Sequence, residues 1–176
     1  EDKQRLYINE GIRMNINYDI NSPTLRFDNL PDGVLRAEDV FNDKRVVVFG
    51  LPGAFTPTCS SKQVPGFDAV YDELLANEID EVYCTSVNDG FTMKAWFEKL
   101  NVKNLKFLAD GSGQFARRIG MLVHKDNLGF GVRSWRYAAV INNGVIEIFL
   151  PEDGICDNCD TDPYEQSTPE NLISQL

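Results

Sequence analysis

A continuous run of apolar, mostly β-branched residues constrains the fold of this chain most. RVVVFGL (45–51) is the kind of run expected of a strand that is buried on both faces of a sheet. EVYCTSV (81–87) has the same character. A strand buried on both faces needs a layer of helices on each side, so the two runs predict an α/β domain.

Helical periodicity follows each of these runs. Apolar residues recur at 64, 67, 70, 71, 74 and 75, which is helical spacing, although Pro65 should kink or loosen the first turns. An amphipathic helix over 91–100, a strand over 105–110 and a short helix over 112–122 are expected next. This alternation predicts a mixed sheet with helices on both faces.

Turn residues predict two hairpins and the start of the last helix. Pro31-Asp32-Gly33 interrupts an alternating segment near the N-terminus, and Asn142-Asn143-Gly144 separates two apolar runs. Both patterns are typical of antiparallel hairpins. Thr168 is expected to be the N-cap of a helix that has Pro169 at its first position.

Composition limits the classes of protein that are compatible with the chain. The 176 residues fit a single domain over 1–176, in which residues 1–23 form a weakly patterned N-terminal extension. A formal charge of −10 disfavours nucleic-acid binding, because it repels phosphate backbones. The longest apolar run is far below the roughly 20 residues of a membrane span, and no leader segment is recognised. The four scattered cysteines favour a reducing, cytoplasmic location.

One cysteine stands where a strand has ended and a helix is about to begin. Cys59 follows the run 45–51 and a turn rich in proline, threonine and glycine. Free N–H groups and the positive end of the helix dipole in a first turn favour the thiolate, which is the reactive form of a cysteine. Thr56 can offer a hydroxyl to this site, and Pro52 can wall a narrow pocket without donating a hydrogen bond. Alternatively, both are ordinary turn residues and Cys59 is a half-buried small side chain.

These residues carry a resemblance to a known family. Pro52-x-x-x-Thr56-x-x-Cys59 matches the active-site motif of the peroxiredoxins, and VPGF, CTSVND, GVRSWRYAAVINNG and PENLISQL resemble the peroxiredoxin-5-like (type II) subfamily. The resemblance covers roughly residues 24–176. It implies a thioredoxin-like fold, and the predicted order of elements is that of thioredoxin once the first hairpin and the 105–120 insertion are removed. It also implies thiol-dependent reduction of hydrogen peroxide and organic (alkyl) hydroperoxides, without a cofactor or a metal.

The resemblance assigns a role to several residues. Cys59 would be the peroxidatic cysteine, which becomes a sulfenic acid, and Thr56 and Pro52 would be its motif partners. Arg136, at the start of a predicted strand in SWRYAAV, would be the active-site arginine, whose charge cannot be lost by deprotonation, with Arg133 as the second candidate. Without the resemblance, Arg136 would be an ordinary strand-end arginine that reaches solvent. The chain departs from its relatives at Gln63, where many of them carry a histidine.

Histidine chemistry therefore has little support in this sequence. The single histidine, His124, is expected in a surface loop. The mechanism that the resemblance implies needs no histidine as general base. The glutamine at position 63 therefore bears on the fine tuning of the site, and the expected reaction is unchanged.

The other three cysteines have different expected roles. Cys84 lies in a predicted core strand and is expected to be a small buried hydrophobe. Cys156-x-x-Cys159 has the spacing of a redox pair or of half a zinc site, but two further zinc ligands are missing. Nearby aspartates disfavour a primary nucleophile at this pair. Cys159 or Cys156 can still resolve a sulfenic acid on Cys59, whereas a 1-Cys mechanism needs neither.

Three hypotheses of different classes follow. The first is a peroxidase that is recycled by glutathione and glutaredoxin or by thioredoxin. The second is a thiol–disulfide oxidoreductase that uses Cys156 and Cys159, and the third is a non-catalytic thioredoxin-like binding module. The resemblance also implies a homodimer, for which exposed Phe55 and Trp135 would supply a flat face. Alternatively, these two aromatics pack locally within the domain.

Overall fold

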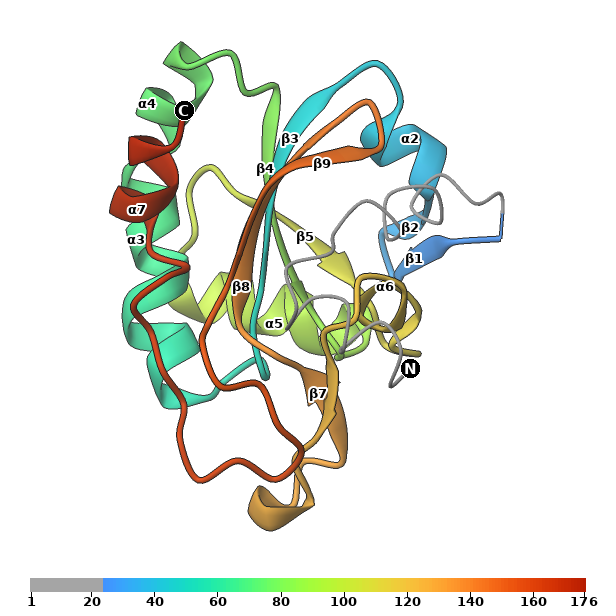
Figure 1. Cartoon of the computed structure of the whole chain (residues 1–176). Helices are drawn as coiled ribbons and strands as arrows, with labels where there is room; N and C mark the ends of the chain where they lie inside the picture. The colour runs from blue at the N-terminus through green and yellow to red at the C-terminus, as the bar shows by residue number, and fades with distance from the viewer. Residues whose placement is uncertain (1–23) are drawn as a thin grey trace.

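A five-stranded mixed sheet forms the centre of the molecule (Figure 1). The computed structural model describes residues 24–176, so the predicted extension over 1–23 lies outside the described residues. The strand order is β5-β4-β3-β8-β9. The strands are β3 (Arg45–Gly50), β4 (Glu81–Ser86), β5 (Lys106–Ala109), β8 (Tyr137–Asn142) and β9 (Val145–Pro151). β3, β4 and β5 are parallel, whereas β8 is antiparallel to both β3 and β9.

The central strand β3 is buried on both faces, as its sequence predicts. Val46 and Val48 belong to one hydrophobic core, and Val47 and Phe49 belong to the other. All four side chains are fully buried. Because successive side chains of a strand point to opposite faces, one apolar run supplies the middle of both cores.

Helices cover both faces of the sheet, which confirms the predicted fold class. The helices are α2 (Ala37–Phe41), α3 (Val64–Ala69), α4 (Tyr71–Ala76), α5 (Gly90–Leu100), α6 (Gln114–Arg118) and α7 (Pro169–Ser174). Side chains of α2 and α6 pack into the first core, and those of α3, α4, α5 and α7 pack into the second. Figure 1 shows α3, α4 and α7 together along one side of the sheet.

The two predicted hairpins are confirmed. β1 (Arg26–Asn29) pairs with β2 (Gly33–Arg36), and β8 pairs with β9. Asn143 and Gly144 form the turn of the second hairpin with φ of 49° and 80°, the left-handed backbone that a tight two-residue turn requires. α2 was not predicted, nor was the small hairpin of β6 (Leu122–His124) and β7 (Val132–Ser134) with the 3₁₀-helix η3 (Asp126–Leu128) between them.

Pro65 disturbs its helix as predicted. The π-helix η2 (Cys59–Gln63) precedes α3, and the Val64 N–H donates to the Cys59 carbonyl five residues back. A proline ring clashes with the carbonyl four residues earlier in regular α-helix, and a π turn is a known way to absorb such an interruption. Thr168 caps α7 as expected, since its side chain accepts from the Asn171 N–H at 3.1 Å.

The carboxylate after β5 gives the fold a pH-dependent stability. Asp110 is buried and accepts hydrogen bonds from the N–H groups of Phe115 and Ala116 at the start of α6. Burial raises its pKa from 3.8 to about 6, although these hydrogen bonds lower it in part. The folded protein therefore binds this proton more tightly than the unfolded chain between these two pH values. The stability contributed by the protonated group is present below about pH 4 and is lost as the pH rises through about 6.

We expect Asp110→Asn to remove this pH dependence. Relative to the wild type, the variant should gain on the order of 2 kcal/mol in free energy of unfolding when the pH rises from about 4 to about 7. Urea unfolding of both proteins at the two pH values measures the difference. An unchanged difference between the proteins would show that Asp110 titrates normally.

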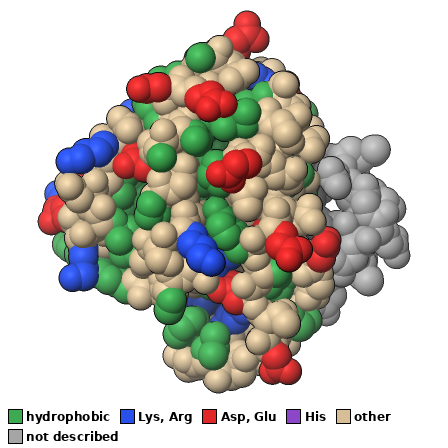
Figure 2. Space-filling view, turned by 90° about the vertical axis from the view of Figure 1, so that its left-hand side faces the viewer, with side chains coloured by type: hydrophobic (Ala, Val, Ile, Leu, Met, Phe, Trp, Pro, Cys, Tyr) green, Lys and Arg blue, Asp and Glu red, His purple; other side chains and the backbone are tan. Residues whose placement is uncertain are grey.

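The surface over α3, α4 and α7 carries charges of both signs. Figure 2 shows acidic and basic side chains scattered across this face, with hydrophobic side chains between them. Within residues 24–176, every helix is too short or too polar to cross a membrane.

Candidate active site

Cys59 lies beyond the carboxyl end of β3, as predicted. β3 ends at Gly50, helical turns begin at Pro57, and Cys59 is the first residue of η2. The Cys59 side chain is fully buried and is not part of a disulfide. The edge beyond the carboxyl ends of the strands is where open α/β sheets bind their ligands, so the thiol stands at the expected place for chemistry.

Arg136 is the residue that contacts this thiol. Arg136 precedes β8, whose Tyr137 pairs with Gly50 at the end of β3, and the sheet therefore carries the arginine to Cys59. Its Nη1 donates to Cys59 Sγ at 3.4 Å and to Gln63 Oε1 at 2.6 Å. Arg136 is 1% exposed, so its charge acts on the sulfur with little screening by water.

Asp162 holds the other side of the same guanidinium. Arg136 Nη2 lies 2.9 Å from each carboxylate oxygen of Asp162. Burial alone lowers the pKa of Arg136, but the negative charges of Cys59 and Asp162 outweigh burial and raise this pKa above its ordinary value. The arginine is thus held in the charged form between a thiol and a carboxylate. Nothing in the sequence around Asp162 indicated this contact, because 26 residues separate the partners.

Thr56 and Pro52 line a pocket beside the loop that leads to Cys59, and both make hydrogen bonds to other groups. The Thr56 hydroxyl donates to the Gly53 carbonyl at 2.7 Å, so its oxygen is free to accept. The Pro52 carbonyl accepts from Arg133 Nη1 at 3.2 Å. Arg133 also donates to the Phe130 carbonyl. The structure therefore places Arg136, the first-ranked candidate, on the sulfur, and Arg133 on the loop backbone.

Gln63 stands at the position where the resemblance leads one to expect a histidine. It is fully buried, and its Nε2 donates to Ser167 Oγ at 3.4 Å while its oxygen accepts from Arg136. A neutral amide thus orients the arginine at this position. His124 is far less buried: it ends strand β6, so its expected place in a loop was wrong, and its side chain is 47% exposed.

Lys125 is a site residue that the sequence analysis missed. It is 2% exposed, and its Nζ lies 5.3 Å from the centre of the Trp135 ring. Burial lowers its pKa, the charge of Arg136 lowers it further, and the charges of Asp162 and Cys59 raise it in part. A second cation therefore lies near the thiol. The sequence predicts a surface loop for the segment LVHKDN, and a lysine in such a loop is usually solvated.

A pocket of about 390 Å³ opens beside these groups. Its walls come from the 52–57 loop, the 125–130 segment and the 159–162 segment. The lining residues are Pro52, Thr56, Pro57, Lys125, Asn127, Leu128, Phe130, Cys159, Asp160, Thr161 and Asp162. The pocket therefore joins two motif residues, Pro52 and Thr56, to a cysteine that is 100 or more positions away in the sequence.

The remaining cysteines occupy two different settings. Cys84 is fully buried in the second core, as expected, and burial raises its pKa well above the ordinary value. Cys156 and Cys159 form a disulfide with a Cα–Cα distance of 5.4 Å. Cys159 is 6% exposed and faces the pocket, whereas Cys156 is exposed.

The structure separates the two aromatics that the sequence left between an exposed face and local packing. Trp135 is 2% exposed, because its ring packs in the first core and its Nε1 donates to the Glu152 carbonyl at 2.8 Å. Phe55 is 50% exposed, as expected. Of the two aromatic residues predicted to form a flat face, Phe55 alone is exposed.

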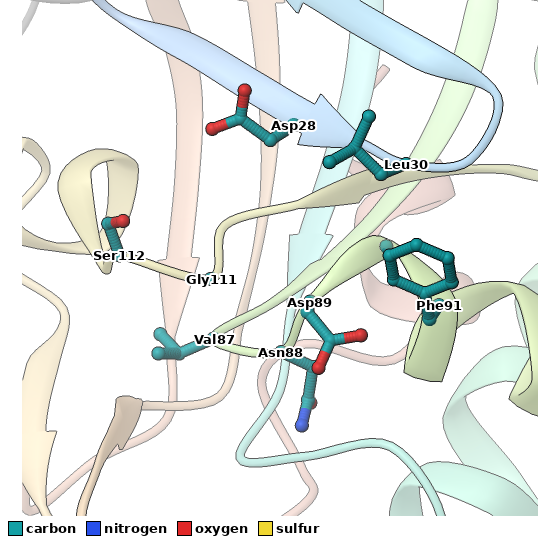
Figure 3. Close-up of a pocket in the computed structure, with 9 residues that line it drawn as sticks. Asp28, Leu30, Val87, Asn88, Asp89, Phe91, Gly111 and Ser112 are labelled. Carbon is teal, nitrogen blue, oxygen red and sulfur yellow. The ribbon is translucent and has the colours of Figure 1, made fainter.

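A second hollow lies at the ends of β4 and β5 (Figure 3). Asp28 and Leu30 border it from the β1 side, and Val87, Asn88, Asp89 and Phe91 border it from the segment that leads from β4 into α5. Asn88 Oδ1 accepts from the Ala54 N–H at 2.9 Å, so this hollow adjoins the Cys59 loop. None of the predicted site residues lines it.

We expect Asp162→Asn to slow the oxidation of Cys59 by hydrogen peroxide, the reaction that the resemblance implies for this thiol, because the variant holds Arg136 less firmly. Loss of a charge-assisted hydrogen bond should lower kcat about five- to thirtyfold, which corresponds to about 1–2 kcal/mol. Stopped-flow kinetics with hydrogen peroxide would separate kcat from KM. Asp162→Glu should restore part of the rate, and exposed Asp153→Asn is the matched control for the change in charge. Equal rates for the Asp162→Asn and Asp153→Asn variants would contradict a positioning role.

Fold and site together define a thioredoxin-like protein built around a buried thiol. A family model described as Redoxin matches residues 22–154. A peroxiredoxin of Rhizobium etli is 58% identical over 139 residues, which are 79% of this chain and 78% of that protein. Reduced Prx3 of Vibrio vulnificus, solved in complex with hydrogen peroxide, is 35% identical with a TM-score of 0.78 and covers 87% of this chain and 94% of its own.

A second solved structure supports the same family assignment. The 1-Cys peroxiredoxin of Plasmodium falciparum is 35% identical with a TM-score of 0.77, over 89% of this chain and 86% of its own. The chain belongs to the peroxiredoxin family. It is therefore a thiol-dependent peroxidase, and the hypothesis of a non-catalytic binding module is wrong.

Proposed function

We propose that Cys59 is the peroxidatic cysteine and that Arg136, Thr56 and Pro52 complete its site. The contact of Arg136 Nη1 with Cys59 Sγ carries this proposal. A buried cation on the sulfur favours the thiolate, which is the nucleophile. Of the two cysteines that are free in the described residues, Cys59 is the one with such a contact.

The site accounts for each part of the reaction. The Cys59 thiolate attacks the hydroxyl oxygen of a hydroperoxide, the S–O bond forms as the O–O bond breaks, and the other oxygen leaves as hydroxide or alkoxide. Negative charge spreads from sulfur over both oxygens in the transition state, where the fixed guanidinium of Arg136 stabilises it. Thr56 Oγ1 can accept the hydroperoxide O–H, because its own proton is donated to Gly53. Protonation of the leaving oxygen yields water or an alcohol, with a sulfenic acid on Cys59.

The proposed substrates are hydrogen peroxide and organic hydroperoxides. The pocket at the site is about 390 Å³ and has apolar walls from Pro52, Pro57, Leu128 and Phe130. Such a pocket can receive the alkyl group of an organic hydroperoxide.

Recycling of Cys59 requires a thiol, for which we propose glutathione with glutaredoxin, or thioredoxin. Cys159 or Cys156 would serve as resolving thiol in the second case. A reducing compartment such as the cytoplasm suits a catalyst with free Cys59 and Cys84. Exposed Phe55 next to the site supports a homodimer.

A coupled assay tests this function. Oxidation of NADPH by hydrogen peroxide would be followed with the glutaredoxin system and with the thioredoxin system, for the wild type and for Cys59→Ser. We expect turnover with at least one system and none with the variant. Turnover that persists in the Cys59→Ser variant would overturn the assignment.

The exposed Cys156 favours a second candidate activity, thiol–disulfide exchange by the Cys156–Cys159 pair. Reduction of insulin disulfides measures it. A rate near that of thioredoxin would support this activity, and a rate near background would remove it.

A further inference from the structure

We propose that Cys159 and Cys156 form an ordered relay that moves the oxidation of Cys59 to the protein surface. The inference rests on the proposed role of Cys59 and adds a sequence of steps. Cys159 receives the oxidation first, Cys156 takes it second, and the Cys156–Cys159 disulfide is the product that an external thiol reduces.

The first step is inferred from the position of Cys159. Cys159 lines the same pocket as Thr56 and Pro52, the motif partners of Cys59. The chain continues from Cys159 to Asp162, which is bound to Arg136, and Arg136 is bound to Cys59. The resolving segment is thus anchored on the active-site arginine itself.

The order of the steps is inferred from the difference in exposure between the two cysteine residues. Cys159 is 6% exposed and faces the pocket, whereas Cys156 is exposed and lies outside the pocket lining. Cys159 is therefore placed to react with Cys59, and Cys156 is placed to react with an external reductant. Their Cα atoms are 5.4 Å apart and their sulfurs are already bonded, so exchange between them needs no rearrangement of the chain.

The charges around the pocket permit a thiolate at Cys159. Asp157 accepts from the His124 N–H at 2.9 Å, and Asp162 holds Arg136. Asp160 follows Cys159 and lines the pocket, but it is exposed, so water screens its charge. The buried Lys125 lines the same pocket as Cys159. A cation in the pocket favours the attacking thiolate, which offsets the negative charge that the sequence alone indicates.

The chemistry of the relay balances without an outside reductant. In the first step the Cys159 sulfur attacks the Cys59 sulfenic acid, the S–O bond breaks, and hydroxide leaves with the proton lost by Cys159 as water. In the second step Cys156 attacks the Cys159 sulfur, and the Cys59–Cys159 bond breaks. Cys59 leaves as a thiolate, which Arg136 receives. One sulfenic acid and two thiols thus become one thiolate, one disulfide and water, with the proton of Cys156 released.

The first step requires Cys59 to leave its buried position. The sulfur lies within η2 (Cys59–Gln63), a single π turn that is closed by the Val64 N–H on the Cys59 carbonyl. The relay therefore requires this turn to open, so that the Cys59 sulfur can reach the pocket that Cys159 lines.

Disulfide mapping of single variants tests the relay. Fully reduced protein would receive one equivalent of hydrogen peroxide without oxygen, followed by acid quench, alkylation and peptide mass spectrometry. In the wild type we expect a Cys156–Cys159 disulfide with Cys59 reduced. Cys156→Ser should trap a Cys59–Cys159 disulfide, and Cys159→Ser should leave a dimedone-reactive sulfenic acid on Cys59. Cys84→Ala is the control, with the same products as the wild type.

Each other outcome counts against the relay. A persistent sulfenic acid on Cys59 of the wild type would show a 1-Cys mechanism, and a lasting wild-type Cys59–Cys159 disulfide would remove the second step. A Cys59–Cys156 disulfide in the Cys159→Ser variant would reverse the order. If Cys59 is not oxidised in any of these proteins, the proposed role of Cys59 fails instead, and with it the basis of the relay.

Discussion

Replacing Cys59 by serine is expected to lower the rate of hydroperoxide reduction by roughly four orders of magnitude or more. A serine hydroxyl has nearly the same shape, but Arg136 cannot make it an effective nucleophile because an alcohol holds its proton far more tightly than a thiol. Since the side chain is fully buried in a polar contact, the fold should be kept. Consumption of hydrogen peroxide by pre-reduced protein, in competition with a haem peroxidase, measures the rate.

The matched control for this variant is Cys84→Ala. Cys84 is the other free cysteine of the described residues and is fully buried in the core. It acts as a small hydrophobe, so its loss should leave the peroxide rate near that of the wild type. A slow Cys84→Ala variant beside a fast Cys59→Ser variant would reverse the assignment of the two thiols.

The second large effect is expected at Arg136. Arg136→Met should lower the rate of sulfenic acid formation by about 10²–10³, the usual cost of one fixed donor to a developing negative charge. Methionine keeps the apolar length of the side chain, and Asp162 is 46% exposed, so its carboxylate can be solvated once it is unpaired. Stopped-flow measurement of the bimolecular rate constant, with the melting temperature of each variant, separates chemistry from folding.

Two further arginine variants sharpen this test. Arg136→Lys keeps the charge but cannot reach Cys59, Gln63 and Asp162 together, so an intermediate rate is expected. Arg133→Met loses a contact with the Pro52 carbonyl and none with Cys59, and its loss should be smaller than that of Arg136→Met. A larger effect at Arg133 would mean that the second-ranked arginine serves the reaction.

The sequence predicted those parts of the fold that local patterns determine. The apolar run 45–51 indicated β3, and Asn143-Gly144 indicated the β8–β9 turn, because each signal depends on neighbouring residues alone. The β6–β7 hairpin was missed, since strands of three residues carry almost no periodicity. The sequence left the burial of Trp135 open, because it depends on packing against residues distant in the sequence.

The candidate site likewise contains residues that a local motif predicts and residues that only the folded chain brings together. Cys59, Thr56 and Pro52 are predicted by a motif of eight residues, and Arg136 by the resemblance of its segment, SWRYAAV, to the family. Asp162 and Lys125 become site residues only when the 125–130 and 159–162 segments meet at the pocket. A lysine and an aspartate in polar segments are usually solvated, so a sequence gives no reason to select these two.

The most direct test of the account is the identity of the first thiol to react. Pre-reduced wild-type protein would be mixed with a substoichiometric amount of hydrogen peroxide in a rapid-quench instrument, and the thiols that remain would be alkylated and quantified by peptide mass spectrometry at successive times. We predict that Cys59 is lost first, in step with peroxide consumption, before any change at Cys84, Cys156 or Cys159. Earlier loss of Cys156 or Cys159 would contradict the central claim that Cys59 is the thiol that reduces the peroxide.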